Sequence, residues 1–128
     1  MINMKEEVDK WWKVALEDLE TSKYNLKGDK LAAASFYTQQ AVEKGLKTLL
    51  LHKSNPLEKT HDIMRLSILV SAPNKIRKIC SAIQPIYFES RYPDRIDFDE
   101  FTDKDYITEL VNNAQEVIEW IKKELEKK

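Results

Sequence analysis

Chain-breaking residues are scarce in this sequence, and this scarcity constrains the fold more than any other feature. Only two glycines and four prolines occur among its 128 residues. An all-β protein would need many more turn residues to connect its strands. Long helices need few of them, and the chain is rich in the lysine, glutamate, leucine and alanine that favour helices. The sequence therefore predicts an all-α protein.

Two long helices are predicted in the first part of the chain. One covers residues about 4–27 and ends at Gly28, where glycine is expected to take the left-handed conformation that closes helices. The next covers about 30–53, with Asp29 as its expected cap. Two neighbouring apolar stripes on this second helix predict a central position with helices on both sides. Gly45 costs it about 1 kcal/mol relative to alanine, which we attribute to close approach of another helix.

Three further helices are predicted in the rest of the chain. Thr60 is the expected cap of a short third helix, and Pro73 suits the first turn of a fourth. The stretch 89–101 lacks helical periodicity and is expected to be an ordered loop, after which residues 102–105 resemble a capping box. Short links predict one domain over residues 1–128, an antiparallel up-and-down bundle of four long helices and one short helix.

This connectivity predicts which functional side chains share an end of the bundle. The second helix ends where the third begins, and the fourth returns to that end. His52, His61 and the loop at residues 91–94 are therefore expected together. The two histidines are the only ones in the chain, so general acid–base chemistry at neutral pH would fall to them. The alternative is structural: His61 bonds locally at its helix start, and His52 stabilises a helix C-terminus.

Composition and charge narrow the functional classes. The formal net charge is −1, so any nucleic-acid contact must come from a local patch. The single cysteine, Cys80, excludes an intrachain disulfide and fits a reducing compartment. The sequence has no phosphate-binding loop, dinucleotide fingerprint or clustered metal ligands, so no cofactor or metal is predicted. A charged N-terminus and the lack of a long apolar run predict a soluble, cytoplasmic protein without a membrane contact.

The segment 90–95 is the most informative candidate site. Its two arginines, tyrosine and aspartate could hold a phosphate and stack on a base. Alternatively, the charged residues pair with each other or with helix ends, and the tyrosine packs as a lid. Two lysines of the second helix could extend a basic groove, or could lie on a solvated helix face. The candidate residues for binding a nucleotide or RNA are Arg91, Tyr92, Asp94, Arg95, Lys44 and Lys47.

Tryptophans raise the question of self-association. Trp11 and Trp12 are adjacent, so they cannot both face the same core. Either Trp11 covers the edge of the bundle or it lies in a subunit contact, where tryptophan is enriched. Trp120 on the last helix raises the same question. Together these residues favour a homodimer.

Several motifs in order resemble those of the HEPN domain family. The stretch FYTQQAVEKGLK at 36–47 is similar to the family's second-helix signature, and RYPD at 91–94 to a loop of its prokaryotic members. The remaining matches are Trp11-Trp12, residues 15–19, residues 60–62 and Leu66. The resemblance spans nearly the whole chain.

The resemblance implies a helical bundle of this length that forms a homodimer. It also implies pairing with a minimal nucleotidyltransferase, often as a toxin–antitoxin couple, and nucleotide binding. Many members are RNases whose site is an arginine followed a few residues later by a histidine. Arg91 matches that arginine, but no histidine follows it between Tyr92 and Asp97, which argues against enzymatic activity. His61 is the remaining candidate for the missing group.

Three functions follow as hypotheses. The first is a non-catalytic dimeric module that pairs with a minimal nucleotidyltransferase and binds a nucleotide or RNA end near Arg91. The second is a metal-independent RNase toxin of a toxin–antitoxin pair, with Arg91 and His61 as candidate catalytic residues and Tyr92 as the alternative to His61. The third is a structural or scaffold dimer without nucleotide affinity.

Overall fold

The computed structural model describes residues 3–87 and 103–127. These residues form five helices and no strand, which confirms the predicted all-α bundle. The helices are α1 Met4–Lys27, α2 Leu31–His52, α3 Ile63–Leu69, α4 Asn74–Ile83 and α7 Lys104–Glu126. None of these helices is long and apolar enough to cross a membrane.

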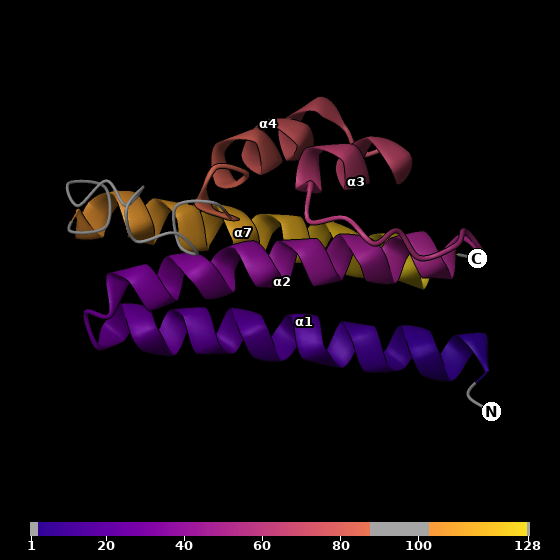
Figure 1. Cartoon of the computed structure of the whole chain (residues 1–128), viewed down its shortest axis with the longest axis horizontal. Helices are drawn as coiled ribbons and strands as arrows, with labels where there is room; N and C mark the ends of the chain where they lie inside the picture. The colour runs from indigo at the N-terminus through magenta and orange to yellow at the C-terminus, as the bar shows by residue number, and fades with distance from the viewer. Residues whose placement is uncertain (1–2, 88–102, 128) are drawn as a thin grey trace.

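Helix α2 is the centre of the arrangement, as its two apolar stripes predict. It contacts each of the other four described helices. Figure 1 shows the long helices α1, α2 and α7 side by side, with the shorter α3 and α4 forming a second layer beside them. Helix α4 has only 10 residues, so three described helices are long, whereas the sequence predicted four. It ends just before Pro85, which cannot donate the next helical hydrogen bond.

The core is a single cluster to which all five helices contribute. Leu49, Leu66, Ile83 and Ile121 are fully buried in it, each gaining about 1.5–3 kcal/mol from removal from water. Gly45 confirms the predicted close approach: a Cβ atom there would lie 2.9 Å from Ile118 Cδ1 and 3.0 Å from Ile121 Cδ1. Helix α7 therefore packs directly on the α2 backbone.

Left-handed residues other than glycine follow the ends of three helices. Asp29, Ser54 and Ser71 have φ angles of 59°, 64° and 57°. In each case the next backbone N–H bonds five residues back, to Asn25, Leu50 and Ser67 respectively, at 2.8–3.2 Å. The prediction that Gly28 takes this role is wrong: its φ is −84°, and Asp29 makes the reversal instead. Aspartate tolerates this conformation better than most residues, which allows the change.

The helix caps also differ in detail from the prediction. Asp29 does not cap α2, because Lys30 occupies the cap position and no side chain bonds to the first turn. The Asp29 carboxylate instead accepts a 2.6 Å hydrogen bond from Lys104 of α7. Asp62, and not Thr60, caps α3; the Thr60 hydroxyl instead accepts from the Asp62 backbone N–H. Asp103 caps α7, one position after the expected Thr102, which lies outside the described residues. Pro73 is the N-cap of α4, one position before the first turn in which it was predicted.

Candidate functional site

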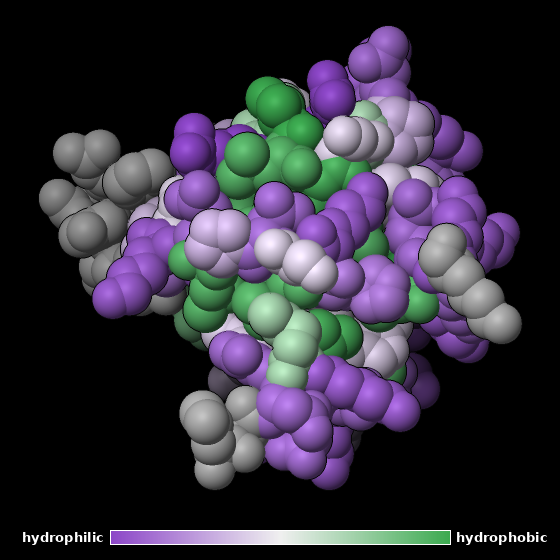
Figure 2. Space-filling model, turned by 90° about the vertical axis from the view of Figure 1, so that its right-hand side faces the viewer, coloured by the Kyte–Doolittle hydropathy of each residue, from purple (hydrophilic) through white to green (hydrophobic). Residues whose placement is uncertain are grey.

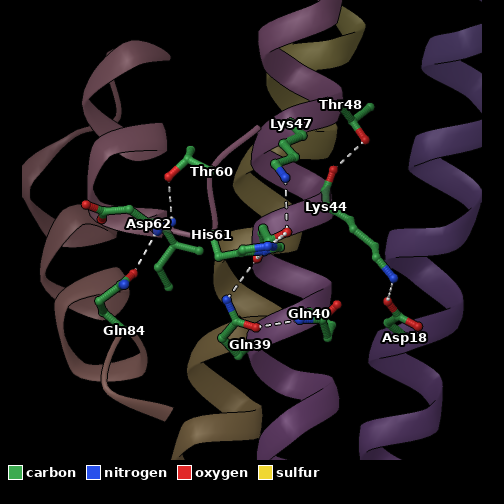
Figure 3. A network of polar contacts seen from close by, with 12 residues as sticks. Asp18, Gln39, Gln40, Lys44, Lys47, Thr48, Thr60, His61, Asp62 and Gln84 are labelled. Atoms are coloured by element: carbon green, nitrogen blue, oxygen red, sulfur yellow. Dashed lines mark hydrogen bonds and ion pairs between the residues drawn. The ribbon is translucent and has the colours of Figure 1, made fainter. Parts of the chain in front are cut away.

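A buried carboxylate on α2 gathers three polar side chains around it. The Glu43 side chain is only 4 % exposed. It accepts hydrogen bonds from Lys47 Nζ at 3.1 Å, Gln39 Nε2 at 3.1 Å and His61 Nδ1 at 3.0 Å (Figure 3). The four-residue spacing of Gln39, Glu43 and Lys47 places them on one face of the helix. These three donors compensate for the cost of burying the charge.

His61 reaches this carboxylate from outside the helix. It lies in the connection between α2 and α3, and Nδ1 is 3.0 and 3.2 Å from the two Glu43 oxygens. Its ring also stacks on Tyr87, with centroids 4.7 Å apart and planes 15° apart. The imidazole is therefore held by contacts at one edge and one face.

The second ring nitrogen of the same imidazole has no partner among the described residues. The His61 side chain is 49 % exposed, and Nε2 makes no hydrogen bond with the described residues. When neutral, an imidazole whose Nδ1–H donates to a carboxylate carries its lone pair on Nε2. When protonated, it presents an N–H donor there. Either form can contact a ligand oxygen.

Lys44 and Lys47, the two lysines predicted to bind a nucleotide or RNA, already form ion pairs within the protein. Lys47 is buried, pairs with Glu43 and lies with Nζ 5.8 Å from the centre of the Trp11 ring. Lys44 pairs with Asp18 of α1 at 2.7 Å, and both side chains are mostly buried. Contact of either lysine with a nucleotide or RNA stays a prediction. The alternative, that both lysines lie on a solvated helix face, does not hold for Lys47, which is buried.

The two histidines do not share an end of the bundle, which corrects the topological expectation. His61 lies beside Glu43, and Glu43 precedes His52 by nine residues, or roughly 13 Å along α2. The reason is that the chain doubles back along α2 before α3 begins, as Figure 1 shows. The other part of the expected cluster lies outside the described residues: Arg91, Tyr92, Asp94 and Arg95. Tyr87, which stacks on His61, is four positions before Arg91.

His52 instead lines an apolar groove at the end where α1 begins. The groove holds about 640 Å³ between α1 and α7, with Val8, Trp12 and Leu125 among its lining residues. Figure 2 views this end and shows hydrophobic residues exposed between hydrophilic ones. His52 thus belongs to a different surface from His61.

Glu43 and Tyr87 are the functional neighbours that sequence reasoning missed. Glu43 was visible as part of a Gln-Glu-Lys series at four-residue spacing on a helix predicted to be buried on both sides. A charged series on such a helix indicates a paired, buried carboxylate. Tyr87 carries no such signal in the sequence, because its contact with His61 depends on the position of the connection before α3.

Other reactive groups are unsuited to chemistry at this face. Cys80 is fully buried in the core, and burial raises the pKa of its thiol from 9.0 to about 12. The thiolate needed for nucleophilic attack is therefore nearly absent at neutral pH. Within residues 3–87 and 103–127, no three histidine, cysteine, aspartate or glutamate side chains gather as a metal site would require.

Comparison with known proteins identifies the family. The HEPN domain model matches residues 8–125. The crystal structure of ST0689, an archaeal HEPN homologue, has 28% sequence identity and a TM-score of 0.79, covering 93% of this chain and 98% of that one. The structure of TT1696 from Thermus thermophilus shares the fold, with 22% identity, a TM-score of 0.81 and coverage of 91% and 97%. No curated protein matches the chain. Because the family model matches almost its full length, the chain belongs to the HEPN domain family.

Proposed function

We propose that this chain is a non-catalytic, dimeric HEPN module that binds a nucleotide or RNA end at the face around His61 and pairs with a minimal nucleotidyltransferase. One observation carries the binding site: His61 is fixed by Glu43 and Tyr87, yet its side chain is 49 % exposed and its Nε2 makes no hydrogen bond with the described residues. A histidine that only filled space would not need two orienting contacts and a half-exposed side chain.

The chemistry of this edge suits a phosphate. Protonated His61 would donate from Nε2 to a phosphate oxygen, while the Glu43 carboxylate stabilises the positive charge at Nδ1. Arg91 follows Tyr87 by four positions, so the connection from Tyr87 to Arg91 is short. An arginine adds bidentate recognition of phosphate, and this pairing of His61 with Arg91 is part of the proposal.

A binding experiment with matched histidine variants tests the site. Adenosine 5′-monophosphate and a short single-stranded oligoadenylate are titrated into the wild type, His61→Ala, Arg91→Ala and His52→Ala by calorimetry. Loss of a charge-assisted hydrogen bond is expected to weaken binding roughly tenfold or more in the first two variants. His52→Ala, on the separate groove, should bind like the wild type. Equal affinity of all four proteins would contradict this site, and no affinity in any would favour the scaffold hypothesis.

The partner and the dimer require their own test. The support here is membership of the family, together with the resemblance of residues 36–47 to its second-helix signature and of residues 91–94 to a loop of its prokaryotic members. Co-expression with a minimal nucleotidyltransferase encoded beside it should give one complex in gel filtration, with light scattering reporting two copies of this chain. Separate elution of the two proteins would exclude the partner, and a monomeric mass would exclude the dimer.

The Glu43–His61 pair also favours a second function, metal-independent RNA cleavage. A carboxylate that orients a histidine through Nδ1 leaves Nε2 as a general base for a ribose hydroxyl. The histidine absent after Arg91 would then be supplied by His61. RNA cleavage by the purified protein, beside Arg91→Ala and His61→Ala, decides between the two functions. Cleavage lost in both variants establishes the enzyme, and an intact dimer without cleavage leaves the binding module.

A further inference from the structure

Resting on the proposed function, we propose that the ligand is a single-stranded RNA segment, with one base stacked on Trp11 while another part of the strand contacts His61. The structure places the Trp11 and His61 side chains on one continuous row of contacts across α1, α2 and the connection to α3. A mononucleotide has one base and can use only one end of this row.

The row is built from side chains that touch in series. Trp11 on α1 lies over Lys47 Nζ, Lys47 pairs with Glu43, and Glu43 holds His61. His61 stacks on Tyr87, which completes the row with a second aromatic ring. The buried ion pair of Lys47 and Glu43 thus has Trp11 on one side and the stacked rings of His61 and Tyr87 on the other. Stacking of successive bases on aromatic side chains is how proteins bind single strands without reading their sequence.

A groove is present at the Trp11 end. It holds about 310 Å³ and is lined by Lys10, Trp11, Val14 and Lys44. Its walls are mostly apolar, and Val14 is 39 % exposed in it. Trp12, the neighbouring residue, packs against the core, so Trp11 is left on the outer flank between α1 and α2. An indole with an apolar neighbour and lysines at its border fits a flat, aromatic base attached to an anionic backbone.

The charges along the row favour stacking over electrostatic attraction. Lys44 and Lys47 neutralise Asp18 and Glu43, and of the three lysines beside Trp11 only Lys10 makes no ion pair with the described residues. Glu6, Asp9 and Lys13 line the adjoining hollow with Lys10, so the surroundings are nearly balanced in charge. Lys10 should therefore add about one phosphate contact, or about −0.7 in the salt slope of a single strand, to the contacts proposed for His61 and Arg91.

The test compares oligoadenylate of about six nucleotides with adenosine 5′-monophosphate on the full-length protein. Trp11→Leu should weaken oligoadenylate binding roughly tenfold, the loss expected for one stacked base, and leave monophosphate binding unchanged. Trp11→Phe keeps an aromatic face and should recover most of the affinity. Trp120→Leu is the matched control, since this tryptophan packs on the core from α7. Lys10→Gln should reduce the salt slope without affecting folding, because Lys10 holds no described partner.

The outcomes separate this inference from the proposed function. Wild-type binding of both probes with no effect of Trp11→Leu or Lys10→Gln overturns the Trp11 contact and leaves the His61 site standing. Equal weakening of both probes also overturns it, since Trp11 would then be no separate contact. A change of oligomeric state in Trp11→Leu would place Trp11 in a subunit interface and overturn it as well. No binding of either probe by the wild type contradicts the proposed function itself.

Discussion

Among single residues, Glu43 has the largest consequences because it is a charge without access to water. Its side chain is 4 % exposed, and that of its partner Lys47 is 7 % exposed. Removing one member of a buried pair leaves the other charge uncompensated, which costs more than the pair itself contributes. The residue that orients the proposed ligand contact thus also determines stability.

Glu43→Ala is therefore expected to lower the free energy of unfolding by about 3–5 kcal/mol. Chemical denaturation measures this loss. Glu20→Ala is the control, because Glu20 is 76 % exposed and its ion pair with Lys23 should contribute less than about 1 kcal/mol. The double variant Glu43→Leu with Lys47→Met should be more stable than Glu43→Ala, since it removes both buried charges. Similar losses in Glu43→Ala and Glu20→Ala would show that the carboxylate is not truly buried.

The left-handed serines allow a prediction in the opposite direction. Ser71 follows α3 with φ 57°, a conformation that costs residues other than glycine about 1–2 kcal/mol. Ser71→Gly should raise the free energy of unfolding by up to about 1 kcal/mol, because part of the relief is offset by the greater flexibility of unfolded glycine. Ser71→Ala should give no such gain in the same thermal unfolding measurement. A loss of stability in Ser71→Gly would mean that the serine side chain contributes more than its backbone conformation costs.

At the scale of helices, burial periodicity made the elements predictable and left their connections undetermined. The stripes on α2 predicted its central position, and Gly45 predicted close approach of another helix, which the structure identifies as α7. The return of the chain along α2 was not predictable, because it depends on the backbone angles of a few residues. Ser54, with φ 64°, begins this return, and nothing in its side chain marks it for a left-handed conformation. The His61–Glu43 contact spans 18 residues and depends on that path.

The packing of α7 on α2 can be tested at Gly45. Gly45→Ala gains about 1 kcal/mol of helix propensity, but its methyl group would meet Ile118 and Ile121 at about 3 Å in a closed core. Overpacking of this kind costs about 1–3 kcal/mol, so a net loss of roughly 1 kcal/mol is expected in thermal unfolding. Adding Ile118→Val removes one of the two clashing methyl groups and should restore part of the loss. A stabilised Gly45→Ala protein would show that the helices can separate slightly at no cost.

For the whole molecule, one feature decides how it unfolds: the five described helices share a single hydrophobic cluster. Leu19 of α1, Ile63 of α3, Cys80 of α4 and Val117 of α7 all belong to it together with α2. Small domains with one core usually unfold in a single cooperative transition. The layer of α3 and α4 should therefore not detach before the three long helices separate, and the surface that carries His61 should persist until global unfolding.

Cys80 gives a direct measure of this cooperativity. In the folded protein its thiol is inaccessible and its pKa is raised to about 12, whereas on unfolding it returns to about 9.0 and becomes exposed. At pH 8 an alkylating reagent should therefore modify Cys80 only in unfolded molecules, since only they provide an accessible thiolate. Across a urea series, the midpoint of rapid labelling should coincide with that of tryptophan fluorescence, which reports on Trp11 and Trp12 in α1 and on Trp120 in α7. Labelling at distinctly lower urea would show that α4 opens while the long helices remain packed, and that the His61–Tyr87 contact is lost before the rest of the fold.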